Sequence, residues 1–271
     1  MTDQRNDFLS GTSGEVSGIR ATTSAVLADA LEDLSRISRL EPLRLRRAAQ
    51  TWPQRRVLAL AVERTDVPNV LAVARDELTH SRHCVTFAAT TAGNRGKFEN
   101  LNELLAVHPA GAHDWLLIVD DDAALPRGFL DAFIFLAERF ALRLAQPAHA
   151  RRSHAAWNVT RRRHGSVVRE TNFVEVGPVV GLQAATFETL LPFPPLKAGW
   201  GLDANWSAIA REHGWRLGVI DATPIRHGLR RIAASYDRQA AVDEARSFLS
   251  DRPYVTSSEA QHTLTTHRRW Q

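Results

Sequence analysis

The sequence has a single cysteine, two lysines and no long uninterrupted apolar run. With Cys84 alone, the chain can form neither an internal disulfide framework nor a multi-cysteine zinc site, which fits a reducing compartment. The most apolar long stretch, residues 129–145, is broken by four charged residues, and the polar residues 1–18 lack the apolar core of a signal peptide. We therefore expect no transmembrane segment and a cytoplasmic location.

Lysine is scarce, so the net charge of +4 comes almost wholly from arginine. Arginines crowd residues 151–169, where they form either a solvated basic loop or a contact with an anionic ligand. The segment lacks the interleaved aromatic residues of nucleic-acid-binding surfaces, and no nucleic-acid partner is expected. At 271 residues and 44% hydrophobic content, the chain can bury the core of one large domain with appendages.

Composition and periodicity divide the chain into four parts. Residues 1–20 look like a mobile polar tail. Residues 21–52 form a helical extension, in which Leu27, Leu31, Leu34 and Ile37 recur at helical spacing. This helix could pack on the main domain or mediate homo-oligomerisation. Residues 53–231 form the main domain, and residues 232–271 form a C-terminal helix, over 236–249, followed by a polar tail.

Strands and helices alternate within the main domain. Apolar runs predict strands over 57–62, 84–89, 115–119, 173–182 and 215–221. Helical spacing predicts helices over 69–80, 98–105 and 126–140, and another that ends near Gly214. This alternation predicts an α/β fold with a mostly parallel central sheet and helices on both faces.

The apolar run of residues 115–119 ends abruptly in three carboxylates, Asp120, Asp121 and Asp122. Open α/β sheets bind ligands at the carboxyl ends of their strands. Because side chains alternate along an extended chain, Asp120 and Asp122 should face one crevice and Asp121 should point away. Two such carboxylates repel each other unless a cation compensates, and a divalent ion is the simplest solution. The alternative is a solvated or helix-capping cluster.

Two further polar residues stand at the ends of predicted elements. Asp203 follows Gly199-Trp-Gly-Leu at the start of a helix, and His227 follows a strand. Asp203 could be a helix cap, since aspartate accepts hydrogen bonds from the first backbone N–H groups. His227 could be an ordinary surface imidazole. Both could equally belong to the site that the three aspartates form.

The order Asp120-Asp-Asp122, then Gly199-Trp-Gly-Leu-Asp203, then His227 resembles glycosyltransferases with the GT-A fold, particularly those of family 2. The resemblance covers residues 56–227 and implies a single Rossmann-like GT-A domain. Two departures are visible. The later motif has Leu-Asp where the family often has Glu-Asp, and the first strand is followed by Glu63-Arg-Thr65 in place of the usual Pro-x-Tyr-Asn-Glu-type loop.

The resemblance also implies roles for individual residues. Asp122, His227 and Asp120 would hold Mn²⁺ or Mg²⁺, and Asp203 would be the catalytic base. The nucleotide-sugar would contact Lys97, Asn102, Asp120 and Asp121, and the acceptor would contact Trp200 and Gly201. The implied reaction transfers a sugar from a nucleoside-diphosphate sugar, with UDP favoured and GDP as the other option, to an acceptor hydroxyl. Direct displacement would invert the anomeric centre.

Neither the acceptor nor the activity is fixed by these motifs. The acceptor could be a glycan, a lipid-linked sugar or a small molecule. One alternative is a non-catalytic protein on the same fold that binds an anion or nucleotide, and another is a metal-dependent phosphatase. The sequence lacks the glycine-rich motifs of P-loop enzymes, dinucleotide-dependent oxidoreductases and sugar nucleotidyltransferases.

Overall fold

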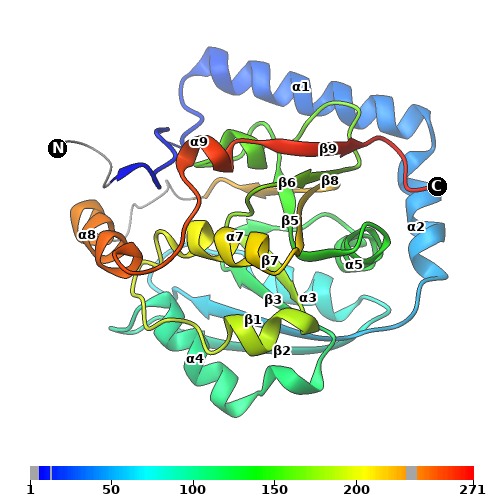
Figure 1. Cartoon of the computed structure of the whole chain (residues 1–271). Coiled ribbons are helices and arrows are strands. Elements are labelled where there is room, and N and C mark those ends of the chain that lie inside the picture. Colours follow the sequence, from blue (N-terminus) through cyan, green and yellow to red (C-terminus); the bar gives the residue numbers. More distant parts are fainter. Residues whose placement is uncertain (1–5, 13, 230–236) are drawn as a thin grey trace.

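The computed structural model describes residues 6–12, 14–229 and 237–271, and places a nine-stranded mixed sheet at the centre of the molecule (Figure 1). The strands are β1 (Arg56–Glu63), β2 (Cys84–Thr91), β3 (Trp115–Asp120), β4 (Ala123–Ala124), β5 (Leu142–His149), β6 (Val168–Thr171), β7 (Val179–Gln183), β8 (Arg216–His227) and β9 (Thr263–His267). The helices are α1 (Ile19–Ser38), α2 (Glu41–Gln50), α3 (Leu71–Thr79), α4 (Lys97–Val107), α5 (Phe129–Arg139), α6 (Phe187–Leu190), α7 (Leu202–Glu212), α8 (Arg238–Leu249) and α9 (Ser257–Ala260).

The strands follow the order β2-β1-β3-β7-β5-β8-β6-β9, with β4 paired to the end of β8. Strands β2, β1 and β3 are parallel neighbours, and so are β5 and β8. The remaining pairs are antiparallel, so that along this path every strand except β7 and β6 runs in one direction. The predicted α/β fold with a mostly parallel sheet is confirmed.

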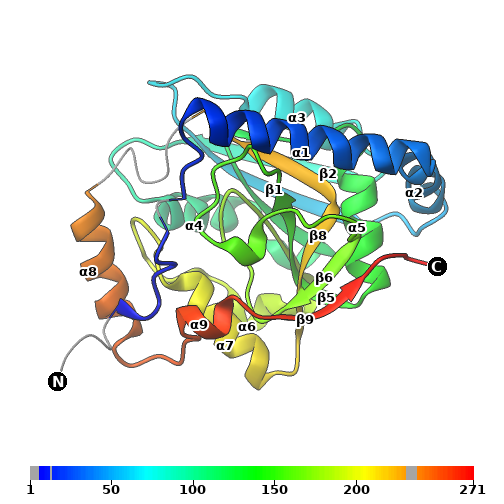
Figure 2. The same ribbon diagram turned by 90° about the horizontal axis from the view of Figure 1, so that it is seen from above.

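Alternate residues of the central strands feed two cores, one on each face of the sheet. Leu58, Leu60 and Leu116 pack with α4, α7 and α8, whereas Val57 and Trp115 pack with α2, α3 and α5. This is the period of two that an extended chain imposes on its side chains. The helices therefore cover both faces (Figure 2). Among the described residues, no helix combines the length and the apolar character that crossing a bilayer demands.

Several segments differ from their predictions. Residues 142–149 form β5, which the sequence pattern did not separate from the preceding helix. The strand predicted over 173–182 begins only at Val179, because Pro178 lacks the N–H that a strand ladder requires. The polar C-terminal tail contributes β9, which pairs with β6. Of the N-terminal tail, Phe8 is buried in the core, while residues 1–5 and 13 lie outside the described chain. The predicted boundary between 231 and 232 also lies outside it.

Candidate active site

A cleft of about 1210 Å³ opens where β1 and β3 end. Loops between strands and helices, the first described residues and α8 form its walls. The predicted site residues that line it are Lys97, Asp120, Asp121, Asp122, Trp200, Gly201, Asp203 and His227. The structure thus brings together residues from four separate parts of the chain. Asn102 is not among the lining residues.

The pairing of β4 with the end of β8 places Asp122 against His227. Ala123 is the register partner of His227, so the residue before β4 reaches the imidazole. His227 Nε2 lies 3.0 Å from Asp122 Oδ2, and the Asp122 side chain is buried. Burial alone would lower the pKa of His227, but the hydrogen bond and the charge of Asp122, with Asp120 and Glu175, raise it above its ordinary value.

Asp120 pairs with a cation at the end of β3. Lys97 Nζ lies 2.5 Å from Asp120 Oδ1. Lys97 is the first residue of α4, and the backbone of Gly177 packs tightly against this pair. A Cβ at Gly177 would lie 3.1 Å from Asp120 Oδ2, so a side chain there would crowd the carboxylate. The glycine keeps this end of the cleft open to a ligand.

Asp121 and Asn102 make contacts that hold loops in place. Asp121 Oδ2 accepts a hydrogen bond from Arg64 N at 2.8 Å, and the Asp121 carbonyl accepts one from Val70 N at 2.7 Å. These bonds fix the loop that follows β1 and faces the cleft. Asn102 exchanges two hydrogen bonds with the backbone of Phe193, at 2.8 and 2.9 Å. Its amide is therefore turned to the proline-rich loop, which contains Pro192, Pro194 and Pro195, rather than to the cleft.

Asp203 stands in the first turn of α7, half-buried at the cleft wall. The helix is capped by Gly201 in a left-handed conformation, and Asp203 Oδ1 accepts a hydrogen bond from Ala204 N at 2.9 Å. Asp203 is thus not the N-cap residue that sequence considerations offered as an alternative. Burial, followed by the negative charge of Glu175, raises the pKa of Asp203 to about 7. A carboxyl group with this pKa can take up a proton at neutral pH.

Trp200 and Gly201 precede Asp203 on the same wall. A Cβ on Gly201 would lie 2.9 Å from Leu249 Cδ1, and the positive φ of 82° is unfavourable for other residues. Gly201 therefore lets the start of α7 pack directly on α8. The Arg238 guanidinium lies 5.9 Å from the centre of the Trp200 ring, a distance at which cation and ring attract each other. Trp200 and Arg238 together form one edge of the cleft.

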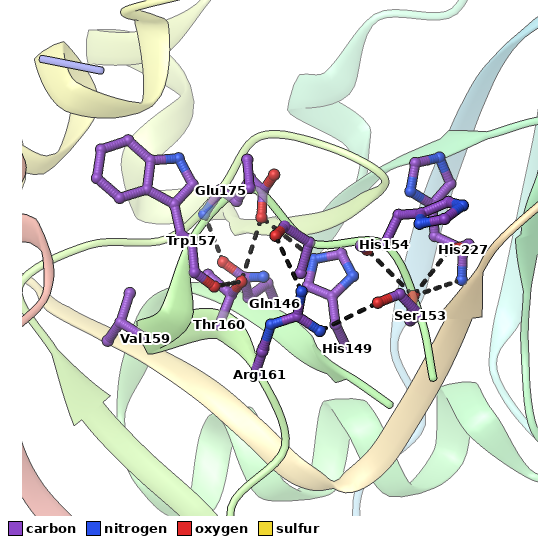
Figure 3. Close-up of polar contacts among 12 residues, drawn as sticks. Gln146, His149, Ser153, His154, Trp157, Val159, Thr160, Arg161, Glu175 and His227 are labelled. Carbon is purple, nitrogen blue, oxygen red and sulfur yellow. Dashed lines mark hydrogen bonds and ion pairs between the residues drawn. The ribbon is translucent and has the colours of Figure 1, made fainter. Parts of the chain in front are cut away.

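Glu175 is a cleft residue that sequence considerations missed. It lies between β6 and β7, and its Oε2 is 3.2 Å from both His149 Nε2 and Thr160 Oγ1 (Figure 3). Its backbone N–H donates to the Gln146 side chain. His149 and Gln146 are both fully buried in β5. His149 and Thr160 therefore hold the carboxylate, Gln146 holds the backbone, and the charge of Glu175 in the cleft acts on Asp203 and His227.

A weak signal for Glu175 exists in the sequence. It is the one charged residue within the apolar run 173–182, and Pro178 three positions later argues against a continuous strand. A charged residue in a run of this kind needs a partner or a functional reason. Its partners come from the unpredicted strand β5 and from the arginine-rich segment, so neither could be named from the sequence.

Replacing Glu175 with glutamine should move the pH dependence of any reaction that uses Asp203 as a base. The negative charge of Glu175 contributes to the raised pKa of Asp203. Removing this charge should bring the pKa of Asp203 below about 7. The pH at which the rate is half-maximal should then be lower. A pH–rate profile of both proteins measures the shift. Glu188→Gln, on the exposed side of α6, is the matched control and should leave the profile where it is.

Three arginines of the segment 151–169 make contacts within the protein. Arg169 is fully buried, and its Nε donates to Asp221 Oδ2 at 2.8 Å. Arg161 Nη1 donates to the Ser153 carbonyl at 3.1 Å. Arg162 pairs with Asp33 of α1 at 2.7 Å. These three arginines are not among the residues that line the cleft. The cations that do line it are Arg64, Arg95, Lys97, Lys197 and Arg238.

Within the described chain, no group of three or more histidine, cysteine, aspartate or glutamate side chains is arranged to hold a metal ion. The Asp122–His227 pair offers two ligands of the right chemistry, a carboxylate and an imidazole. Mg²⁺ in particular is commonly bound by one or two protein carboxylates, with phosphate oxygens and water completing its coordination. The donor set therefore fits a divalent ion that arrives together with a phosphorylated ligand.

No protein-family model and no curated protein sequence matches the chain. Solved structures with a similar fold include the mannosyltransferase PcManGT from Pyrobaculum calidifontis in complex with GDP-Man and Mn²⁺, at 14% identity and a TM-score of 0.48, over 78% of this chain and 69% of that one. GalNAc-T7 with UDP, GalNAc and Mn²⁺ is similar at 9% identity and a TM-score of 0.45, over 68% of this chain and 45% of that one. A shared fold does not establish a shared chemistry, so the function depends on the residues of the cleft.

Proposed function

We propose that the protein is a metal-dependent glycosyltransferase that moves a sugar from a nucleoside-diphosphate sugar to an acceptor hydroxyl. The observation that carries this proposal is the cleft itself. It joins the Asp122–His227 pair to Asp203, a carboxyl group whose pKa is raised to about 7. The Asp122–His227 pair suits a diphosphate with a divalent ion, and Asp203 suits a hydroxyl group that must lose a proton.

The donor side is built from carboxylates and cations. Asp122 and His227, with Asp120 beside them, would hold Mn²⁺ or Mg²⁺. The bound ion would neutralise the charge that develops on the departing diphosphate. Lys97 lies against Asp120 and can contact a phosphate oxygen from the first turn of α4. Arg64 and Arg95 also line the cleft, so its cations suit a ligand with two negative phosphate groups. UDP is the favoured carrier and GDP is the other.

The acceptor side is formed by Asp203 and Glu175, with Trp200 at the edge. As the acceptor oxygen bonds to the anomeric carbon, the bond from that carbon to the diphosphate oxygen breaks, and Asp203 takes the hydroxyl proton. Glu175, held by His149 and Thr160, keeps the affinity of Asp203 for that proton high. With the base opposite the leaving group, direct displacement inverts the anomeric centre. The Trp200 ring offers an apolar face to the acceptor.

Calorimetric titration of UDP and of GDP, each with and without Mn²⁺, tests the donor site. We expect one nucleotide to bind with Mn²⁺ present and to bind about tenfold or more weakly without it, since the ion bridges protein and diphosphate. UMP and GMP, which lack the second phosphate, are the matched controls and should bind weakly in both conditions. If neither diphosphate binds with Mn²⁺ present, the proposal is wrong. Release of phosphate from p-nitrophenyl phosphate would then point to the phosphatase.

A further inference from the structure

Helix α1 has its apolar side turned outwards. Ile19, Leu27, Leu31 and Leu34 are each more than half exposed, and they recur at the spacing of one helical face. Leu40 and Leu43, also more than half exposed, extend the row into α2. In Figures 1 and 2, α1 lies along one edge of the molecule, and no ribbon covers its outer side. We call this row, with its neighbours Val26 and Ile37, the outer apolar row.

The side of α1 that faces the protein is charged instead. Asp29 accepts hydrogen bonds from the backbone N–H groups of Arg151 and Arg152, at 2.9 and 3.1 Å. Arg36 Nη1 donates to the Asp221 carbonyl at 2.9 Å, and Glu32 pairs with His164. A surface helix of a globular protein normally buries its apolar face and exposes its charges. Here the polar contacts dock the helix, so the outer apolar row is left for another contact.

The exposed charge around the outer apolar row is positive except at Asp33. Arg20, Arg39, Arg44, Arg46 and Arg47 are exposed on α1, on α2 and between them. Within residues 19–50, all of which the structure describes, Asp33 is the one exposed acid, and it is paired with Arg162. The other acids of this stretch, Asp29, Glu32 and Glu41, face the protein. A partner of this surface would therefore meet apolar side chains flanked by unopposed positive charge.

We propose that α1 and α2 dock the protein on the surface of an anionic membrane. A helix with a continuous apolar face and arginines beside it lies in the plane of a bilayer, with its leucines among the acyl chains and its cations at the headgroups. The charged inner side prevents α1 from spanning the bilayer. A second copy of the chain fits less well, because two such surfaces would bring arginines together without acidic partners.

A short piece of chain joins the outer apolar row to one wall of the cleft. Residues 8–12 line the cleft, and the Gly14 carbonyl accepts a hydrogen bond from Ala155 N at 2.9 Å. Four residues further along the chain, Gly18 leads into α1. The seven residues from Thr12 to Ile19 span at most about 25 Å, so a membrane bound along α1 would lie within this reach of the cleft wall. If the protein is the proposed transferase, on which this last step rests, its acceptor is a sugar or alcohol carried by a lipid.

Flotation of the full-length protein with vesicles tests the docking. Vesicles of equal parts phosphatidylglycerol and phosphatidylcholine should carry the protein, and phosphatidylcholine vesicles should carry much less. Leu27→Gln with Leu34→Gln should weaken binding to the anionic vesicles about tenfold or more, because two exposed leucines would no longer enter the bilayer. Added salt should weaken it as well. Val107→Gln with Leu264→Gln, at exposed positions of α4 and β9, is the matched control and should bind like the unchanged protein.

Two results would overturn the proposal. One is the failure of anionic vesicles to carry the unchanged protein. The other is binding of the leucine variant to these vesicles as tight as that of the unchanged protein. If the vesicles carry neither protein and light scattering shows a dimer that the leucine variant abolishes, the row belongs to a second copy. Calorimetry of nucleotide binding on the leucine variant separates these results from the transferase proposal. The nucleotide affinity of the leucine variant should equal that of the unchanged protein, because neither leucine lines the cleft.

Discussion

Replacing Asp203 with asparagine is expected to lower the rate of sugar transfer about 1000-fold, within the range that removal of a general base produces. Asparagine has nearly the same shape and can still accept the hydrogen bond from Ala204 N, so the first turn of α7 should be preserved. It cannot take a proton from the acceptor hydroxyl. The affinity for nucleoside diphosphate should stay within about twofold of the original, since the donor contacts lie elsewhere in the cleft. Transfer rates and calorimetry on the same preparation provide both values.

The pKa of Asp203 gives this prediction a pH dependence. The carboxylate is the active form of a base, so the rate of the unchanged protein should rise with pH through about 7. The folded-state pKa is raised, so the folded protein holds this proton more tightly than the unfolded chain, and stability should fall as pH rises from about 4 to about 7. Asp203→Asn removes this loss and should be about 1–3 kcal/mol more stable at pH 8.

Asp251→Asn is the control for this substitution, because Asp251 is exposed and does not line the cleft. Its transfer rate and stability should match those of the unchanged protein. A different pattern would contradict the assignment of the base. If Asp203→Asn transfers sugar at the normal rate and melts at a lower temperature at pH 8, the carboxylate stabilises the start of α7 and takes no part in the reaction.

The parts of the site that could be predicted are those that a strand fixes locally. The run ending in Asp120 had to be a buried strand, and the carboxyl end of such a strand faces a ligand crevice whatever the rest of the chain does. The alternation of side chains predicts that Asp121 points away from the crevice, yet Asp121 lines the cleft together with its two neighbours and accepts a hydrogen bond from Arg64 N. Asp203 could be placed for a similar reason, at the start of a strongly patterned helix.

The other site residues depend on contacts between distant segments, and the periodicity of the sequence does not encode such contacts. Asn102 belongs to a correctly predicted helix, yet its amide is taken up by Phe193 from the proline-rich loop. Glu175 is held by residues of β5, a strand hidden behind the apolar helix that precedes it. The spacing of the α1 leucines predicts either packing on the main domain or homo-oligomerisation, and an apolar stripe normally faces the core. Charged contacts with the arginine-rich segment reversed that orientation.

Replacing Asp122 with alanine should weaken nucleoside-diphosphate binding about 100-fold in the presence of Mn²⁺ and leave the weak metal-free binding unchanged. Only a ligand to the ion produces this difference, since loss of a direct nucleotide contact would weaken binding in both conditions. The substitution also removes the hydrogen bond and the charge that raise the pKa of His227, so this pKa should fall. Calorimetry with and without Mn²⁺ measures the first effect, and NMR titration of the imidazole measures the second.

Asp114→Ala is the matched control for Asp122→Ala. Asp114 stands just before β3, at the opposite end from the three aspartates, and its Oδ2 accepts a hydrogen bond from Arg56 N at 2.7 Å. The control should lower stability by about 1 kcal/mol through the lost hydrogen bond, and it should leave nucleotide binding unchanged. Asp122→Ala also loses a hydrogen bond, the one to His227, so both variants should be less stable and only Asp122→Ala should bind the nucleotide more weakly. Equal affinity with and without Mn²⁺ in both the unchanged protein and Asp122→Ala would exclude Asp122 as a metal ligand.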